Sequence, residues 1–199
     1  MTDIIRELDK AFFFTINGFH FEWLDYVMKY ISWPKTWFPF YVLLAWFLHR
    51  RLGQKAWTII LALIILVVAT DQGANIIKKL VERPRPCHEH DFALYIHLVD
   101  PCGGAYGFVS NHAANCFAMV TFIWLLLRRR SNLPGFLLIW AIIVSFSRIY
   151  LGQHYPSDIA GGALFGIICA VIMRIAYGYI AKRAEGNLRT WMFGARAVY

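Results

Sequence analysis

Residues 147–158, SRIYLGQHYPSD, hold an arginine, a histidine and an aspartate between two long apolar stretches. Charged groups beside such stretches are costly unless they have partners or a function. Asp158 follows His154 by four residues and can accept a hydrogen bond from its ring, which leaves the other ring nitrogen free to attack an electrophile. The spacing therefore predicts a nucleophile pair, with Arg148 beside it as a cation for an anionic substrate.

Two more polar clusters lie at the ends of apolar stretches. Lys78 and Arg85 follow one stretch, whereas Ser110, Asn111 and His112 open the next. Taken singly, the cations could anchor lipid head groups and the histidine could be an ordinary interfacial residue. Ser110 is placed as a helix N-cap, however, and the free amides of a helix N-terminus bind anions.

Together the three clusters contain two histidines, one aspartate and three cations, which suits phosphoryl transfer. Cations and helix-end amides would hold the non-bridging oxygens, one histidine would attack phosphorus, and the other would protonate the leaving oxygen. Metal binding is the rival use of histidines here. His88 and His90, with Glu89 and Asp91, have a spacing that could hold a divalent ion, but the cations crowding the main site argue against a metal there.

The composition predicts an integral membrane protein, because hydrophobic residues make up 59% of the chain and charged residues only 16%. The formal net charge is +8, and most basic residues stand in short clusters beside apolar runs. Such clusters set topology and contact anionic head groups, so the lipid bilayer is the expected partner and nucleic acid is not.

The apolar pattern predicts an all-α, polytopic bundle of about five transmembrane helices, over residues 33–48, 57–77, 111–127, 138–151 and 158–177. Residues 1–31 are too polar to cross hydrocarbon easily. They are interpreted as two amphipathic helices that lie in the interface and are separated near Asn17 and Gly18, with a polar first span as the alternative. We expect one domain over residues 1–199, with a transmembrane core at 33–182 and a cytoplasmic tail at 183–199.

Basic residues orient the bundle through the positive-inside rule. The clusters at residues 50–55, 128–130 and 182–183 all fall on one side, predicted to be cytoplasmic, so the loop at 83–107 faces outward. Lys78, Arg83 and Arg85 lie on the outward side against this rule, which indicates a function. Cys87 and Cys102 flank the outward loop and could form a disulfide in an oxidising compartment, a point that the sequence leaves open.

The three clusters resemble the signature motifs of the type 2 phosphatidic acid phosphatase family. The matching residues are Lys78, six intervening residues, Arg85 and Pro86; then Ser110 and His112; then Ser147, Arg148, five residues, His154, three residues and Asp158. The resemblance implies a metal-independent lipid phosphatase that needs no cofactor and has a helical bundle core. It further implies that His154 is the nucleophile and forms a phosphohistidine, Asp158 orients it, His112 is the general acid, and phosphate is held by Lys78, Arg85, Ser110 and Arg148.

One position departs from the family pattern, because the second motif usually reads Pro-Ser-Gly-His and Asn111 here replaces its glycine. Asn111 adds a side-chain amide where glycine would allow close backbone approach, and we group it with the phosphate-binding residues.

Among substrates, polyprenyl diphosphates such as undecaprenyl diphosphate are the first expectation, at the outer face of the cytoplasmic membrane. Phosphatidylglycerophosphate, phosphatidic acid and lipid A phosphates stay open. Head-group selectivity is expected in the loop at 87–108 and in the N-terminal helices. Rival interpretations are a non-enzymatic membrane protein that binds an anion and the soluble vanadium-dependent haloperoxidases, whose motifs are similar.

Overall fold

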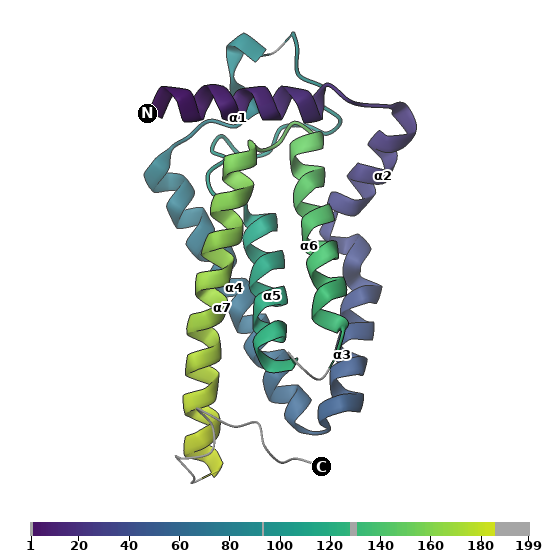
Figure 1. Cartoon of the computed structure of the whole chain (residues 1–199), viewed down its shortest axis with the longest axis vertical. Helices are drawn as coiled ribbons and strands as arrows, with labels where there is room; N and C mark the ends of the chain where they lie inside the picture. Colours follow the sequence, from purple (N-terminus) through teal and green to yellow (C-terminus); the bar gives the residue numbers. More distant parts are fainter. Residues whose placement is uncertain (1, 93, 128–130, 186–199) are drawn as a thin grey trace.

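The computed structural model describes residues 2–92, 94–127 and 131–185. In this part of the chain the regular elements are helices, and no strand is present. The α-helices pack side by side into an elongated bundle with one helix across its end (Figure 1). They are α1 (Thr2–Asn17), α2 (Glu22–Ser32), α3 (Phe38–Leu52), α4 (Lys55–Val81), α5 (Asn111–Leu127), α6 (Leu133–Tyr150) and α7 (Pro156–Glu185), with 3₁₀ turns at Pro34–Trp37, Pro86–His88 and His90–Phe92.

The predicted all-α membrane bundle is confirmed. Among the described residues, three helices are long and apolar enough to cross a membrane, namely α4, α6 and α7 over Lys55–Val81, Leu133–Tyr150 and Pro156–Arg183. The α5 helix is apolar but has only 17 residues, and α3 has 15. The protein is thus a multi-pass membrane protein, whereas a count of five spans stays a prediction.

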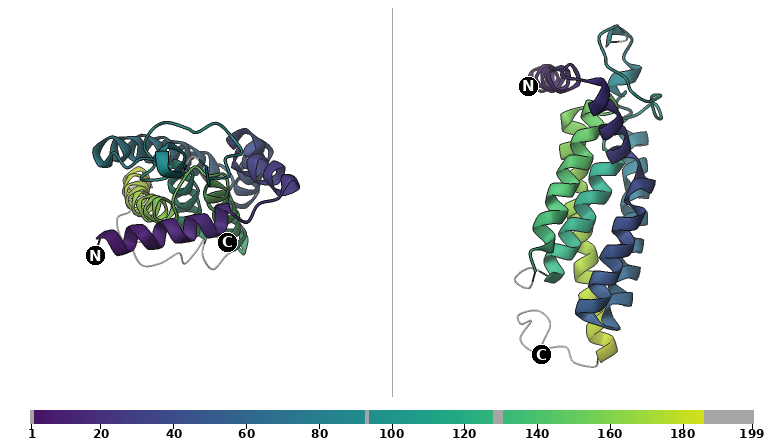
Figure 2. Two further views of the ribbon diagram at one scale, coloured as in Figure 1. Left: turned by 90° about the horizontal axis from the view of Figure 1, so that it is seen from above. Right: turned by 90° about the vertical axis from the view of Figure 1, so that its right-hand side faces the viewer.

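The N-terminal helices follow the prediction in part. The first helix ends at Asn17, where the break is expected, and it lies across the ends of α6 and α7 (Figures 1 and 2). The second helix does not lie flat, because it runs down the side of the bundle toward α3 (Figure 1). Its polar residues are used inside the protein: the Asp25 carboxylate bonds the His97 ring at 2.9 Å and the Tyr150 hydroxyl at 2.6 Å. Whether α2 also contacts the membrane interface stays a prediction.

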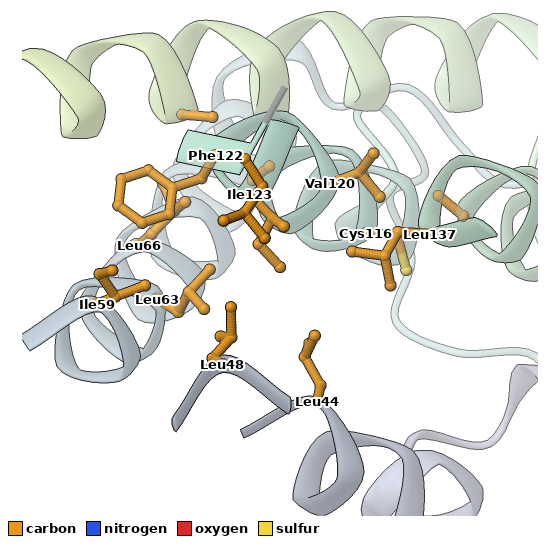
Figure 3. Packing of buried hydrophobic residues seen from close by; sticks show 14 of the residues in the cluster. Leu44, Leu48, Ile59, Leu63, Leu66, Cys116, Val120, Phe122, Ile123 and Leu137 are labelled. Carbon is orange, nitrogen blue, oxygen red and sulfur yellow. The ribbon is translucent and has the colours of Figure 1, made fainter. Parts of the chain in front are cut away.

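Apolar side chains from α3 to α7 form the main core. Leu44 and Leu48 of α3 point toward residues of α4 and α5, among them Leu63 and Cys116 (Figure 3). Burying such side chains inside a bundle gains mainly close packing, since lipid tails are as apolar as leucine. The core thus holds the helices in register but carries no chemistry of its own.

The α5 and α7 helices approach each other closely at Gly166. A Cβ atom there would lie 2.1 Å from the carbonyl oxygen of Ala114, so only glycine permits this backbone contact. Near the ends of the same helices, the Ser110 amide donates to the Asp158 carbonyl at 3.0 Å. This crossing places the second and third polar clusters side by side.

The two ends of the bundle differ in charge. The basic residues Arg50, Arg51, Lys55 and Arg183 lie at the end of the bundle opposite α1, which we call the inner end. The predicted arginine triplet at 128–130 and most of the predicted tail lie outside the described residues. The loop at 82–110 and α1 lie together at the other end, called the outer end below (Figure 1).

Candidate active site

His154 lies at the centre of the outer end, in the short loop between α6 and α7, and only 2% of it is exposed. Its Nδ1 lies 3.3 Å from the Asp158 Oδ2, and its Nε2 lies 3.1 Å from the Arg85 Nη1. Because a guanidinium can only donate, Nε2 must accept this bond and Nδ1 must carry the ring proton. The lone pair of His154 therefore points toward the cations.

The charge state of His154 follows from its surroundings. Burial first, and then the positive charges of Arg85, Arg148 and Lys78, lower the pKa of His154 well below its ordinary value of 6.5. The imidazole is consequently neutral at neutral pH, which is the form that can act as a nucleophile.

Asp158 is fully buried and is held from several directions. Its Oδ2 accepts a hydrogen bond of 3.0 Å from the Tyr155 amide, and its Oδ1 accepts one of 3.0 Å from Arg83 Nη1. Gly107 lies so close that a Cβ atom there would be 2.8 Å from Oδ2. The carboxylate thus has one permitted position, with Oδ2 toward the His154 ring.

Arg83 joins this carboxylate to the helix that lies across the bundle end. Its guanidinium pairs with Asp9 of α1, contacts the Ser157 hydroxyl and lies 4.2 Å above the Tyr155 ring. Asp9 also accepts the Ser157 amide at 2.9 Å. From the sequence, Arg83 is recognised only as a cation on the unexpected side of the membrane. Asp9 is not recognised at all, because it looks like any other acidic residue of an amphipathic helix.

Arg85 is anchored by backbone carbonyls of the outer loops. Its Nε donates to the Gly104 carbonyl at 2.6 Å and its Nη1 to the Gln153 carbonyl at 3.1 Å. Burial lowers the pKa of Arg85, but an arginine stays charged in proteins. A fixed positive charge therefore lies directly against the reactive nitrogen of His154.

Lys78 reaches the start of α5. Its ammonium donates to the Val109 carbonyl and to the Asn111 side-chain oxygen. The Asn111 amide nitrogen in turn donates to Asp71 Oδ1 at 2.7 Å and to Asn75 Oδ1 at 3.0 Å. Both amide hydrogens are used this way, so Asn111 is fixed against α4 and positions Lys78. Its grouping with the phosphate-binding residues stays a prediction.

Two polar atoms at the site have no hydrogen-bond partner among the described residues, the Ser110 hydroxyl and the Arg148 Nε. Ser110 occupies the N-cap position of α5, since its carbonyl accepts the Ala114 amide at 3.0 Å, but its fully buried hydroxyl caps nothing. Unpaired buried polar groups cost about 1–3 kcal/mol each. Such atoms are available to a ligand that brings acceptor oxygens.

Ser32, which no sequence motif indicates, links His112 to Arg148. The Ser32 carbonyl accepts a bond of 3.2 Å from His112 Nε2, and the Ser32 hydroxyl accepts one from Arg148 Nη1. Ser32 is the last residue of α2 and is 4% exposed. No signal in the sequence distinguished it from other serines, because its role depends on the packing of α2 against α6.

Two cavities meet at Ser32, Pro34 and His112. One of about 560 Å³ lies among α3, α4, α5 and α6 and is lined mostly by apolar side chains, including Leu44, Leu63 and Trp140. The other, of about 900 Å³, lies against α2 and reaches Arg148. A ligand at His112 therefore has apolar space toward the bundle interior and more polar space along α2.

The residues of the alternative metal site, His88 to Asp91, lie in the outward loop. In the described part of the chain, no three His, Cys, Asp or Glu side chains gather in a way that could hold a metal ion. His88 instead donates from Nε2 to the Gly103 carbonyl at 3.0 Å. The loop is closed by a disulfide between Cys87 and Cys102, whose Cα atoms are 5.9 Å apart.

The structure brings all eight predicted site residues to the outer end of the bundle. A buried, neutral histidine, oriented by a carboxylate and surrounded by fixed cations and unpaired donors, defines the class of a phosphoryl-transfer site within a membrane bundle. Comparison with models of known protein families identifies the family. Residues 55–182 match the model of the PAP2 superfamily, so the chain belongs to that superfamily, and it is a lipid phosphatase.

Proteins that are similar to this chain include lipid phosphatases, as this assignment predicts. The chain is 33% identical over 170 residues to a lipid A 4'-phosphatase of Bacteroides thetaiotaomicron, covering 83% of this chain and 75% of the relative. It is 30% identical over 189 residues to a lipid A 4'-phosphatase of Porphyromonas gingivalis, covering 92% and 79%. Its fold resembles the crystal structure of a PAP2 type phosphatidylglycerolphosphate phosphatase from Bacillus subtilis, with a TM-score of 0.66, 20% identity, and coverage of 90% and 87%.

Proposed function

We propose that this lipid phosphatase hydrolyses a phosphate monoester on the sugar of a saccharide lipid of the lipid A type. The reaction passes through a phosphohistidine on His154. One observation supports the reaction: the lone pair of His154 Nε2 points at Arg85, and the same end of the bundle holds the unpaired Ser110 hydroxyl and Arg148 Nε. These groups would complete their hydrogen bonds on the non-bridging oxygens of a bound phosphate.

The reaction then takes two displacements. In the first, Nε2 of His154 forms a bond to phosphorus while the bond to the ester oxygen breaks, and His112 gives a proton to that leaving oxygen. In the second, water attacks the phosphohistidine, a proton passes to His112, and the bond between nitrogen and phosphorus breaks. Asp158 keeps the Nδ1 proton in place and stabilises the positive charge that develops on the ring.

Substrate binding follows from the two cavities. The apolar cavity of about 560 Å³ suits hydrocarbon chains, and the cavity along α2 provides space beside the phosphate. The relatives named lipid A 4'-phosphatases favour a saccharide lipid over the polyprenyl diphosphate that is the first expectation from the sequence. Undecaprenyl diphosphate, phosphatidylglycerophosphate and phosphatidic acid are the alternatives.

We further propose that the outer end faces the periplasm or cell exterior and that the protein lies in the cytoplasmic membrane. The basic residues at the inner end support this orientation through the positive-inside rule. The disulfide between Cys87 and Cys102 supports it independently, because disulfides persist in oxidising compartments.

The test is phosphate release by the purified protein in detergent, with chelator present, from a panel of lipid phosphates. The panel contains hexa-acylated lipid A, undecaprenyl diphosphate, phosphatidylglycerophosphate and phosphatidic acid. We expect lipid A to give the highest kcat/KM and to lose its 4'-phosphate, as read by mass spectrometry. A higher value for undecaprenyl diphosphate would overturn the substrate, and activity that requires added divalent metal would overturn the mechanism.

A further inference from the structure

One face of α2 lines the larger cavity. Lys29 and Tyr30 follow Tyr26 by three and four residues, so the three lie on one side of the helix, and Trp33 lines the same cavity just beyond the helix end. The rings of Tyr26 and Tyr30 are 77% and 63% exposed, although both line a cavity of about 900 Å³. The same cavity reaches His112 and Arg148, so this aromatic face adjoins the catalytic groups.

The α2 helix is held firmly in this orientation by its other polar residues. Asp25 bonds both His97 and Tyr150, and Ser32 at the helix end bonds both His112 and Arg148. An aromatic surface that is fixed before binding loses little conformational entropy when a ligand arrives. The aromatic face of α2 is therefore preorganised for binding a ligand.

The second wall of the cavity comes from the outward loop. The Lys29 ammonium lies 2.6 Å from the Asp100 carboxylate, and Asp100 stands two residues before the disulfide-bonded Cys102. The pair offers donors and an acceptor but little net charge. Neutral hydroxyl, amide and ester groups suit such a pair, whereas a second phosphate would meet a carboxylate that offsets the lysine charge.

We propose that this cavity is a saccharide subsite, in which the sugar ring that bears the scissile phosphate packs on Tyr26 and Tyr30 and hydrogen-bonds Lys29 and Asp100. A pyranose has a face of C–H groups that can pack on an aromatic ring, and hydroxyls at its rim that both donate and accept. Continuity with His112 and Arg148 places this ring beside the phosphate. The inference rests on the proposed function, since it names the residues that select the substrate of the same site.

The main rival is an aromatic belt, in which Tyr26, Tyr30 and Trp33 anchor the protein at the membrane surface. A belt contacts lipid head groups in general and has no preference for the substrate's sugar. The two roles are separated by comparing a substrate that has a sugar with one that lacks it.

The experiment measures kcat/KM for lipid A and for dioleoyl phosphatidic acid in the same detergent micelles, for the wild type and the double variant Tyr26→Ala/Tyr30→Ala. We expect the ratio of the two values, lipid A over phosphatidic acid, to fall about tenfold, with most of the change in KM. Tyr26→Phe/Tyr30→Phe, which keeps both rings, should retain most of the ratio. Tyr95→Ala is the matched control, because Tyr95 is 75% exposed on the outward loop and does not line the cavity.

Other results overturn the proposal in distinguishable ways. An equal loss on both lipids, or an unchanged ratio, contradicts the saccharide subsite while the phosphatase activity stands. If the wild type releases phosphate from phosphatidic acid but not from lipid A, the proposed substrate fails. Should the double variant not purify as a folded protein, Lys29→Met and Asp100→Asn test the same ratio, and an unchanged ratio for both overturns the subsite.

Discussion

The two sides of His154 differ in how completely their polar groups are paired. On the Nδ1 side, Asp158 is bonded by Tyr155 and Arg83, and Arg83 is bonded by Asp9. Among the groups proposed to contact phosphate, by contrast, the Ser110 hydroxyl and the Arg148 Nε have no partner among the described residues. We call these groups the unpaired side, and we call Asp158 with its partners the paired side, which holds His154 in position.

This difference separates two kinds of contribution to catalysis. Groups on the unpaired side should contact the phosphate directly, and groups on the paired side should act by holding His154 in one tautomer and orientation. Substitutions on the two sides are expected to change different kinetic constants.

Removing the nucleophile gives the largest effect, because both sides then have nothing to act on. His154→Ala, or the closer isostere His154→Gln, should lower kcat by at least about four orders of magnitude, as expected for loss of a covalent catalyst. The measurement is phosphate release, with a monodisperse gel-filtration peak as the control for folding. Retention of near wild-type activity would remove His154 from the nucleophile role.

The carboxylate behind the nucleophile comes next. Asp158→Asn leaves the side-chain shape intact but can present an amide N–H to Nδ1, which favours the wrong tautomer, and should lower kcat about a thousandfold. KM should change little, because Asp158 faces away from the phosphate. A rise in KM with kcat unchanged would place Asp158 on the binding side and break the comparison.

Substitutions in the ion pair between Arg83 and Asp9, which lies behind Asp158, should also lower kcat, but by a smaller factor. Arg83→Ala removes hydrogen bonds between charged groups, each worth about 1.5–3 kcal/mol, and should lower kcat about tenfold to a hundredfold. Asp9→Asn should give a weaker loss in the same constant. Glu7→Gln, on the same helix but exposed and paired with Lys10, is the matched control. A loss as large as that of Asp9→Asn would contradict the assignment.

These predictions also show what the sequence could and could not reveal. The motifs and the apolar stretches predicted the bundle and the gathering of eight polar residues at one of its ends, because each motif is local and adjoins a helix end. Asp9 and Ser32 could not be found, because their partners lie 148 and 116 residues away in Ser157 and Arg148. The contacts of α2 could not be read for a similar reason: Asp25 bonds His97 and Tyr150, which are distant in sequence, and hydropathy alone does not reveal such partners.

The pH dependence tests the charge state on the unpaired side. Burial and neighbouring cations lower the pKa of His154 well below 6.5, so the free enzyme should keep this ring neutral as pH falls from about 8 to 6. Protonation, and with it loss of the nucleophile, should begin only below that window. Arg85→Met removes one nearby cation and should move the midpoint upward.

The measurement is the ring chemical shift of ¹³C-labelled His154, identified by its absence in His154→Gln. A midpoint near 6.5 in the wild type, or no upward movement in Arg85→Met, would contradict the electrostatic account of the site.

The disulfide should have the smallest effect, because it supports the loop and does not contact His154. Cys87→Ser/Cys102→Ser loosens the loop that carries Gly104, the acceptor for Arg85, and Asp100. We expect KM to rise about two- to fivefold with kcat nearly unchanged, since each immobilised loop contact is worth only about 1 kcal/mol. Steady-state kinetics of the double variant measure both constants. A large fall in kcat would place the loop among the groups that hold His154.

The central claim is that Nε2 of His154 becomes bonded to phosphorus during turnover. The most direct measurement is a rapid quench of the enzyme with ³²P-labelled lipid phosphate into alkaline denaturant, followed by peptide mapping. The account predicts label that is stable to alkali, labile to acid, and confined to the peptide that contains His154, with none in His154→Ala. Full turnover without such label, or label on another residue, would contradict it.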